Sequence, residues 1–185
     1  MRSRHPEALP RLWLMTDERL GERLWDALDA LPRGSGVIFR HYSLRPAQRR
    51  ALFARVARFC RQRGLIVLRA GNTPLGRGED GAHNARLPHR GINSRAVHSR
   101  AELQAAIRAK ADCVLISPIF PTNSHPGASA LGVTRAAVLA AASPVPAIAL
   151  GGMTPVRARR LKSAGFHGWA AIGWWADQKR KAVPI

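Results

Sequence analysis

The chain has 185 residues, a length typical of one domain that can bury a sizeable hydrophobic core. Hydrophobic residues make up 46% of it, which excludes a disordered chain, and no apolar run approaches the ~20 residues of a membrane-spanning helix. The formal net charge of +19 favours anionic ligands. The basic residues are nevertheless spread over nearly every segment, which argues against a dedicated nucleic-acid surface.

Two further features bear on the cellular location. The basic residues 1–6 are followed by no apolar core of the signal-peptide type. The two cysteines, Cys60 and Cys113, are far apart in the sequence. We therefore predict a cytoplasmic protein with reduced, buried thiols and with neither a zinc site nor a disulfide framework.

Strand and helix patterns alternate along the first 71 residues. Short apolar runs that end in polar residues predict strands, and apolar positions at helical spacing predict helices. The predicted strands are residues 11–17, 36–42 and 64–71, and the predicted helices are residues 18–31 and 46–63. The second helix holds the densest group of arginines, which we interpret as a solvated helix face.

The alternation breaks down between residues 72 and 91, which are rich in Gly, Pro, Arg and His and have no apolar period. One or two helices are therefore expected to be missing or reduced to turns. Residues 76–81 match G-x-G-x-x-G, but they neither follow a strand directly nor open a helix, so we do not read them as a dinucleotide motif. Residues 81–84 form a weak strand candidate.

Regular patterns return after residue 94. Ser99 and Glu102 form a capping-box signature at the start of a helix. The apolar run Cys113–Ile119 predicts a buried strand that opens into polar residues, as parallel α/β folds do where they bind ligands. The other predicted strands are residues 95–98, 145–152 and 168–175, and the other helices are residues 131–142 and 154–165.

Eight strands that alternate with helices predict an α/β fold, a (β/α)₈ TIM barrel, over residues 1–185 as a single domain. The usual barrel has ~250 residues, so this one must be compact, with the helices after strands 3 and 4 reduced or missing. A barrel brings the ends of its strands to one rim, where the loops after strands 7 and 8 commonly hold phosphate. The candidates for that role are Gly151, Gly152, Ile172 and Gly173, with the hydroxyls of Thr122 and Ser124, and His83 and His98 are candidates to line the pocket.

Residues 14–17, 111–122 and 146–153 resemble the thiamine phosphate synthase / TenI family, with residues 95–103 and 164–168 in the expected order. This resemblance implies a barrel that joins a thiazole phosphate to an aminopyrimidine pyrophosphate, with Mg²⁺ on the leaving pyrophosphate. The residues that match the thiazole-phosphate half of the family's site are Thr122, Ser124, Gly151, Gly152, Ile172 and Gly173.

The pyrophosphate half of the family's site is only partly present. Of its Gln-x-Arg-x-Lys pattern only Arg40 remains, and its Asn-Asp pair falls at residues 68–69, where the second residue is Arg69. His125 stands where the family has a lysine. The resemblance therefore implies Arg40 and His125 as the catalytic residues that meet the phosphates. The carboxylates that would bind Mg²⁺ have no counterpart.

Alternatives stay open at this point. Arginines could neutralise the anion without metal, or Glu79 and Asp80 could supply metal ligands from a shifted position. The chain is then a transferase of thiamine biosynthesis, a non-catalytic binder of thiamine phosphate or thiazole phosphate that serves as sensor or carrier, or a protein that binds polyanions through its charge. The expected partner is a small phosphorylated ligand, with no membrane; monomer and homodimer are both open.

Overall fold

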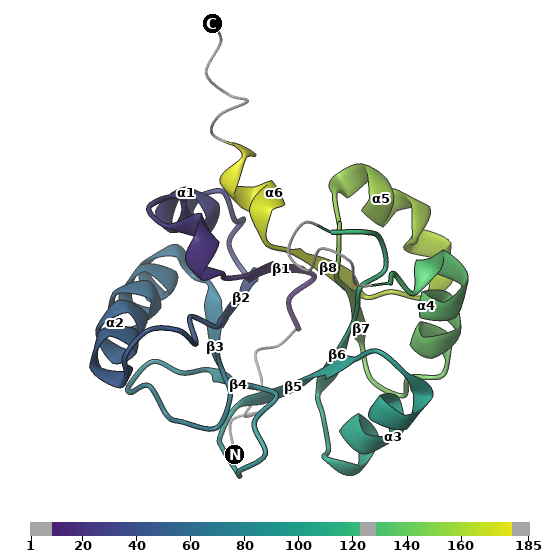
Figure 1. Cartoon of the computed structure of the whole chain (residues 1–185), viewed down its shortest axis with the longest axis horizontal. Coiled ribbons are helices and arrows are strands. Elements are labelled where there is room, and N and C mark those ends of the chain that lie inside the picture. Colours follow the sequence, from purple (N-terminus) through teal and green to yellow (C-terminus); the bar gives the residue numbers. More distant parts are fainter. Residues whose placement is uncertain (1–8, 123–128, 179–185) are drawn as a thin grey trace, which may run out of the picture. The chain divides into compact units, whose positions relative to one another are not determined.

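The computed structural model describes residues 9–122 and 129–178, and its eight strands follow one another in chain order in a closed barrel (Figure 1). The strands that pair do so in parallel. They are β1 (Leu12–Met15), β2 (Gly36–Phe39), β3 (Ile66–Ala70), β4 (Gly81–His83), β5 (Ile92–Val97), β6 (Cys113–Ile116), β7 (Ala147–Ala149) and β8 (Gly168–Ala171). The predicted (β/α)₈ class is confirmed.

The helices lie outside the strands (Figure 1). They are η1 (Glu18–Leu20), α1 (Arg23–Asp29), α2 (Pro46–Arg63), α3 (Arg100–Arg108), α4 (Gly132–Ala141), α5 (Pro155–Arg160), η2 (Lys162–Ala164) and α6 (Gly173–Ala176), where η marks a 3₁₀ helix. The chain from β3 to β5, all of it described, contains no helix, as predicted from residues 72–91. The G-x-G-x-x-G sequence, residues 76–81, lies in this irregular stretch, its last glycine begins β4, and it opens no helix.

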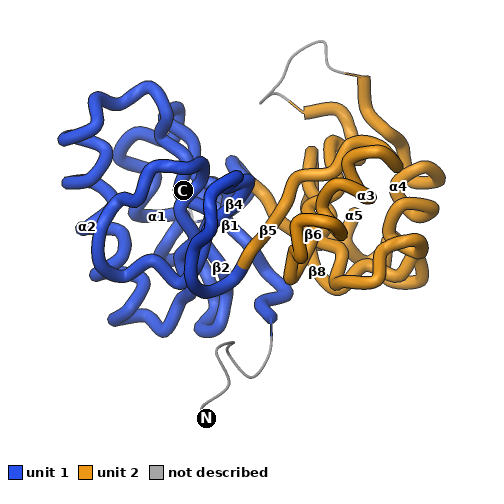
Figure 2. Tube along the Cα trace, turned by 90° about the horizontal axis from the view of Figure 1, so that it is seen from below, with its two compact units in different colours: residues 1–92, 172–185 blue, residues 93–171 orange. Residues whose placement is uncertain are grey.

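The chain forms two compact units (Figure 2). Unit 1 comprises residues 1–92 and 172–185, and unit 2 comprises residues 93–171. In unit 1, β1 pairs with β2, β2 with β3 and β3 with β4. In unit 2, β5 pairs with β6, β6 with β7 and β7 with β8. That residues 1–185 make a single domain stays a prediction.

The longest helix, α2, begins and ends at the residues that the sequence pattern predicted. It begins with a proline in its first turn, where the missing N–H costs nothing, and it ends at Gly64, which adopts the left-handed conformation. Its buried positions Phe53, Val56 and Cys60 recur at helical spacing. Within the two described ranges no helix is long and apolar enough to cross a membrane.

Both cysteines are buried free thiols, as predicted. Burial raises the pKa of the Cys60 thiol to about 12, and it does the same for Cys113. Neither thiol is therefore ionised at neutral pH, which suits a packing role.

Three predicted elements were wrong in part. The helix predicted for residues 154–165 is divided at Leu161 into α5 and η2. The helix predicted for residues 18–31 is divided into η1 and α1 because the chain turns at Gly21, which has a φ of +50°. The strand predicted for residues 168–175 ends at Ala171, and the apolar residues after it form α6. An apolar run of this length does not distinguish a buried strand from a buried helix. The indole N–H of Trp175 in α6 donates to the Trp13 carbonyl, at 3.0 Å, which anchors this helix in unit 1.

Candidate functional site

The loops that follow β6 and β7 are hydrogen-bonded to each other in unit 2. The Ile119 N–H donates to the Leu150 carbonyl at 2.9 Å, and the Phe120 N–H donates to the Gly151 carbonyl at 3.2 Å. Thr122, a predicted phosphate ligand, comes two residues after Phe120 and is half-buried. The loop after β6 is therefore held to the glycine pair by backbone hydrogen bonds. That Thr122 and the glycines bind phosphate stays a prediction.

Gly151 and Gly152 form a tight turn with unused amide groups. Both adopt positive φ values, +96° and +61°. Among the described residues, neither amide N–H has a hydrogen-bond acceptor. Successive N–H groups in such a conformation can form an anion-binding concavity.

The turn leaves no space for side chains. A Cβ at Gly151 would lie 2.7 Å from the Cα of Pro118 and 3.0 Å from the Ile119 nitrogen. A Cβ at Gly152 would lie 2.7 Å from the Pro121 carbonyl oxygen. Both contacts involve backbone atoms that cannot move without disturbing the loop after β6. Glycine is therefore required at both positions.

Arg157 adds a positive charge beside this turn, and sequence reasoning missed it. It lies in the first turn of α5, where its N–H donates to the Oγ1 of the N-cap Thr154 at 3.3 Å. Its Nη1 donates to the Gly152 carbonyl at 2.5 Å, and its guanidinium lies 4.7 Å from the centroid of the Phe120 ring. One side chain therefore contacts both loops. The signal that could have revealed it is an arginine three residues after a Thr-Pro helix start, which follows a glycine pair.

His98 lies at the end of β5 in the same unit. Its Nδ1 is 2.5 Å from the Ser117 carbonyl oxygen, which can only accept, so Nδ1 carries the proton. Its own backbone N–H donates to a carboxylate oxygen of Glu102 at 2.6 Å. The predicted capping interaction at Ser99 is present as well, since the Ser99 hydroxyl accepts from the Glu102 N–H. His98 is thus held at the β5–β6 edge of unit 2.

The other predicted site residues do not all belong to this unit. Ser124 and His125 lie outside the described residues. Ile172 directly precedes α6 and Gly173 is its first residue, so both belong to unit 1. His83 is buried at the end of β4, where its carbonyl accepts from the Gly71 N–H at 2.9 Å.

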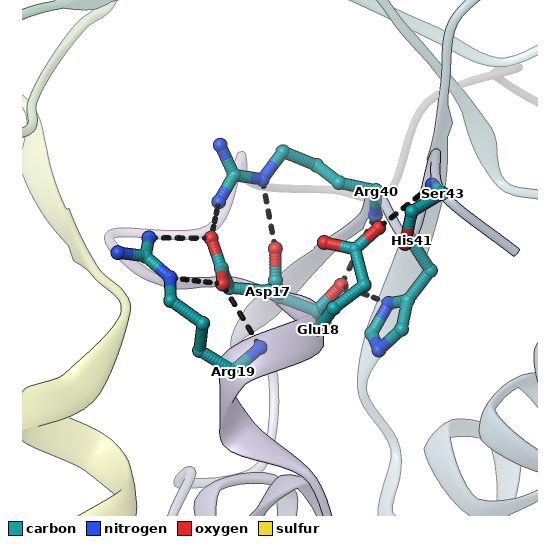
Figure 3. Close-up of polar contacts among 7 residues, drawn as sticks. Asp17, Glu18, Arg19, Arg40, His41 and Ser43 are labelled. Carbon is teal, nitrogen blue, oxygen red and sulfur yellow. Dashed lines mark hydrogen bonds and ion pairs between the residues drawn. The ribbon is translucent and has the colours of Figure 1, made fainter. Parts of the chain in front are cut away.

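In unit 1 the predicted catalytic Arg40 is engaged by a carboxylate (Figure 3). Its Nη2 lies 2.5 Å from an Asp17 oxygen, and its Nε donates to the Thr16 carbonyl at 2.8 Å. Arg19 binds the same carboxylate through Nε at 2.7 Å. Asp17 is therefore shared by two guanidinium groups, one after β1 and one after β2.

This arrangement sets the charge of Asp17. The side-chain hydrogen bond from Arg19 is the largest influence and, with the charge of Arg40, it outweighs the opposing effect of burial. The pKa of Asp17 is lowered from 3.8 to about 2. The cluster thus holds one firm negative charge between two positive ones.

His41 is buried next to the Asp17, Arg19 and Arg40 cluster, in contact with Thr16. The Thr16 hydroxyl accepts from the Arg40 N–H at 3.0 Å and lies 3.0 Å from Nδ1 of His41. A hydroxyl can donate to Nδ1 or accept from it, so this contact fits either tautomer of the His41 ring. Burial lowers the pKa of His41, which favours the neutral form of the ring.

Arg69, at the position of the family's Asn-Asp pair, is also engaged. Its side chain is 3% exposed, its Nε donates to Glu79 at 2.9 Å, and its Nη1 donates to the Gly71 carbonyl. Glu79 also accepts from the Leu75 N–H at 2.5 Å. The ion pair therefore closes the irregular loop that stands in place of a helix after β3.

The described residues do not fit the Mg²⁺ that the resemblance implies. Across residues 9–122 and 129–178 no group of three or more His, Cys, Asp and Glu side chains could hold a metal. Glu79 is bound to Arg69, and Asp80 accepts from the Val67 N–H at 2.8 Å, near the start of β3 and not at its end. The alternative in which Glu79 and Asp80 supply ligands has no support in these contacts. An arginine at the position of a carboxylate disfavours a cation.

The comparisons with known proteins agree on one family. The family model described as thiamine monophosphate synthase matches residues 75–174. The thiamine-phosphate synthase of Salinispora tropica is 37% identical over 84 residues, which cover 45% of this chain and 39% of that protein. The putative thiamine-phosphate synthase 2 of Aquifex aeolicus is 26% identical over 187 residues, which cover 91% of this chain and 99% of that protein.

A solved structure shares the fold. Thiamine phosphate pyrophosphorylase from Pyrococcus furiosus superposes with a TM-score of 0.75 at 20% identity, over 89% of this chain and 86% of that one. The first two curated relatives are matched over much less of their length, 39% for Salinispora tropica and 33% for Laribacter hongkongensis.

Proposed function

The chain belongs to the thiamine monophosphate synthase family, and from this premise we propose that it binds a phosphorylated thiazole, thiazole phosphate or thiamine phosphate, at the loops after β6 and β7. The observation that carries the proposal is the pair of adjacent amides of Gly151 and Gly152, which have no acceptor among the described residues. Phosphate oxygens are strong acceptors and would satisfy both.

The neighbours of the glycine pair support this reading. Arg157 supplies a cation that contacts Gly152, and Thr122 supplies a hydroxyl on the adjoining loop. Backbone amides would fix the position of the phosphate, the hydroxyl would add a directional hydrogen bond, and the guanidinium would balance the charge. Each of these groups belongs to unit 2, so the proposed site needs no residue of unit 1.

Binding without turnover is the form of the proposal that the contacts of unit 1 favour. The coupling reaction requires a second, pyrophosphate-bearing substrate, for which Arg40 and His125 are the candidates. Arg40 is bound to Asp17, and Arg69 is bound to Glu79. The described donors do not fit Mg²⁺. We therefore propose a sensor or carrier of the phosphate ligand first and a transferase of thiamine biosynthesis second.

Two assays on the purified protein separate these functions. Calorimetry should show thiamine phosphate binding that Thr122→Val weakens about tenfold, because a hydrogen bond to a charged group is lost. Radiolabelled thiazole phosphate and aminopyrimidine pyrophosphate should yield no thiamine phosphate, with or without Mg²⁺. Product formation that is lost in Arg40→Ala would establish the transferase instead, and the absence of any binding would remove both functions.

Arg157→Gln should weaken thiamine phosphate binding by about tenfold, because it removes the charge beside Gly152. Arg157→Lys keeps the charge and should recover part of the affinity, although it loses the stacking on Phe120. The matched control is Arg159→Gln, an exposed arginine on the same helix, which should bind like the unmodified protein. Equal affinities of the Arg157→Gln and Arg159→Gln variants, at unchanged melting temperatures, would contradict the role of Arg157.

A further inference from the structure

Helix α2 in unit 1 carries six arginines and no acidic residue in its eighteen positions. Arg49 is buried and its guanidinium donates to the carbonyls of Arg40 and Ala70, at 2.9 and 2.7 Å. The exposed ones are Arg50, Arg55, Arg58, Arg61 and Arg63. Of these, within the described part of the chain, Arg63 alone forms an ion pair, at 3.6 Å from Asp29. The outer face of α2 therefore carries four exposed arginines outside any ion pair of the described residues, and the acidic groups near them are Glu22, beside Arg55 and Arg58, and Asp80, near Arg61.

A groove with aromatic side chains runs along this face, between α1 and α2. Its volume is about 300 Å³, and it is lined by Glu22, Trp25, Arg55, Arg58, Phe59 and Gln62. The Trp25 and Phe59 ring centroids are 6.0 Å apart with the planes tilted by 58°, and both rings are half-buried. The Arg55 guanidinium lies 4.8 Å from the Trp25 centroid. The groove thus presents flat aromatic and guanidinium surfaces next to unpaired cations.

We propose that this groove binds single-stranded nucleic acid. An unpaired base can stack on an aromatic ring or on an arginine plane, and flanking phosphates can bind Arg50, Arg58 and Arg61. The amide of Gln62 and the carboxylate of Glu22 offer hydrogen bonds to a base edge. A duplex does not expose base faces, so the aromatic pair favours a single strand.

Other occupants fit the groove less well. A lipid surface is complementary in charge, but the exposed large hydrophobic residues of the described chain are Tyr42, Leu87, Val133, Val138 and Val156, none of them on α1 or α2. No apolar side chain of this face is therefore placed to enter a bilayer. A second copy of the same face would bring like charges together. The proposal is independent of the phosphate site in unit 2.

The test is fluorescence anisotropy with a labelled single-stranded oligonucleotide of about 12 bases, a length within the usual site sizes. Arg55→Gln/Arg58→Gln is compared with Arg100→Gln/Arg108→Gln, which removes the same charge from exposed positions on α3. At about 0.1 M salt the α2 double variant should bind at least tenfold more weakly, and the slope of log affinity against log salt should fall by about 0.7, because Arg58 provides one of the phosphate contacts. The α3 variant should change much less.

Trp25→Ala tests the stacking part, with a further loss of about tenfold at unchanged salt slope. If the Trp25→Ala variant unfolds, the comparison of the α2 and α3 double variants alone tests the proposal. Equal losses in the α2 and α3 double variants would overturn the proposal, because binding would then reflect net charge only. Equal binding of duplex DNA, or of vesicles rich in anionic lipid, would overturn it as well, and so would no binding at about 0.1 M salt.

Discussion

Gly151→Ala is expected to reduce thiamine phosphate binding by well over tenfold and to lower the melting temperature by about 10 °C. Gly151 has a φ of +96°, and an added Cβ would meet the Pro118 backbone at 2.7 Å. A positive φ at a non-glycine residue costs about 1–3 kcal/mol, and the contact with backbone adds a similar amount. For a protein of this size 1 kcal/mol corresponds to ~2–4 °C. The loop must shift to relieve the contact, and its amides then no longer converge on one phosphate.

The control isolates the backbone cost from the contact. Gly34 has a φ of +80°, but an added Cβ would have no atom within 4 Å. Gly34→Ala should lower stability by only about 1 kcal/mol and leave binding intact. Calorimetry and thermal melts of the two variants make the comparison. If Gly151→Ala bound thiamine phosphate as well as Gly34→Ala does, the glycine turn would not be the phosphate site.

Asp17→Asn is expected to remove a step in stability between about pH 4 and pH 2. The folded-state pKa of Asp17 is about 2, below the ordinary value of 3.8. A lowered pKa contributes stability that is fully present above pH 4 and is lost as the pH falls through about 2. The Asp17 side chain is only 10% exposed, so solvent screens its ion pairs little. We expect the free energy of unfolding to fall by about 2 kcal/mol across this step.

Denaturant unfolding at several pH values between about 2 and 7 measures this step. The range covers the folded-state pKa of Asp17 and its ordinary value. The matched control is Asp177→Asn, which removes a half-exposed ion pair with Arg23. That variant should keep the acid-dependent step, since exposed pairs contribute little. An Asp17→Asn protein with the same acid profile as the unmodified chain would show that the carboxylate does not bridge Arg19 and Arg40 in solution.

Much of the fold could be predicted from the spacing of apolar residues and from the glycines and prolines at the ends of helices and strands. The short weak segment at residues 81–83 could be assigned as a strand because the barrel needed an eighth, and the absence of helices between β3 and β5 followed from the missing apolar period. The predictions failed where the period was ambiguous. Trp174 and Trp175 were predicted as strand because an apolar run fits both elements; the contacts of α6 with α1 and the bond from Trp175 to Trp13 are long-range interactions that the run does not reveal.

The candidate site could be predicted in part, and the omissions share a cause. Gly151 and Gly152 follow a buried strand, a local signal that sequence reasoning can use. Arg157 acts through a contact with Gly152 and Phe120 that depends on how two loops meet. Arg40 could be located, but its pairing with Asp17 depends on the register of β1 and β2.

The arginines of α2 illustrate the same limit. In the sequence they are one basic segment among many, and the prediction of a solvated face followed from the spread of basic residues over nearly every segment. The structure adds Trp25, which comes from α1 and lies against Phe59 and Arg55. Side chains from two helices make the groove, so a pattern within either helix could not reveal it.

A calorimetric titration with thiamine phosphate, in EDTA and again in Mg²⁺, tests most directly whether this family member binds its phosphate ligand without metal. The glycine amides and Arg157 predict binding of the same affinity in both conditions, with no heat of turnover when the two precursors are mixed. Binding that appears only with Mg²⁺, or formation of thiamine phosphate from the precursors, would contradict a metal-independent phosphate site.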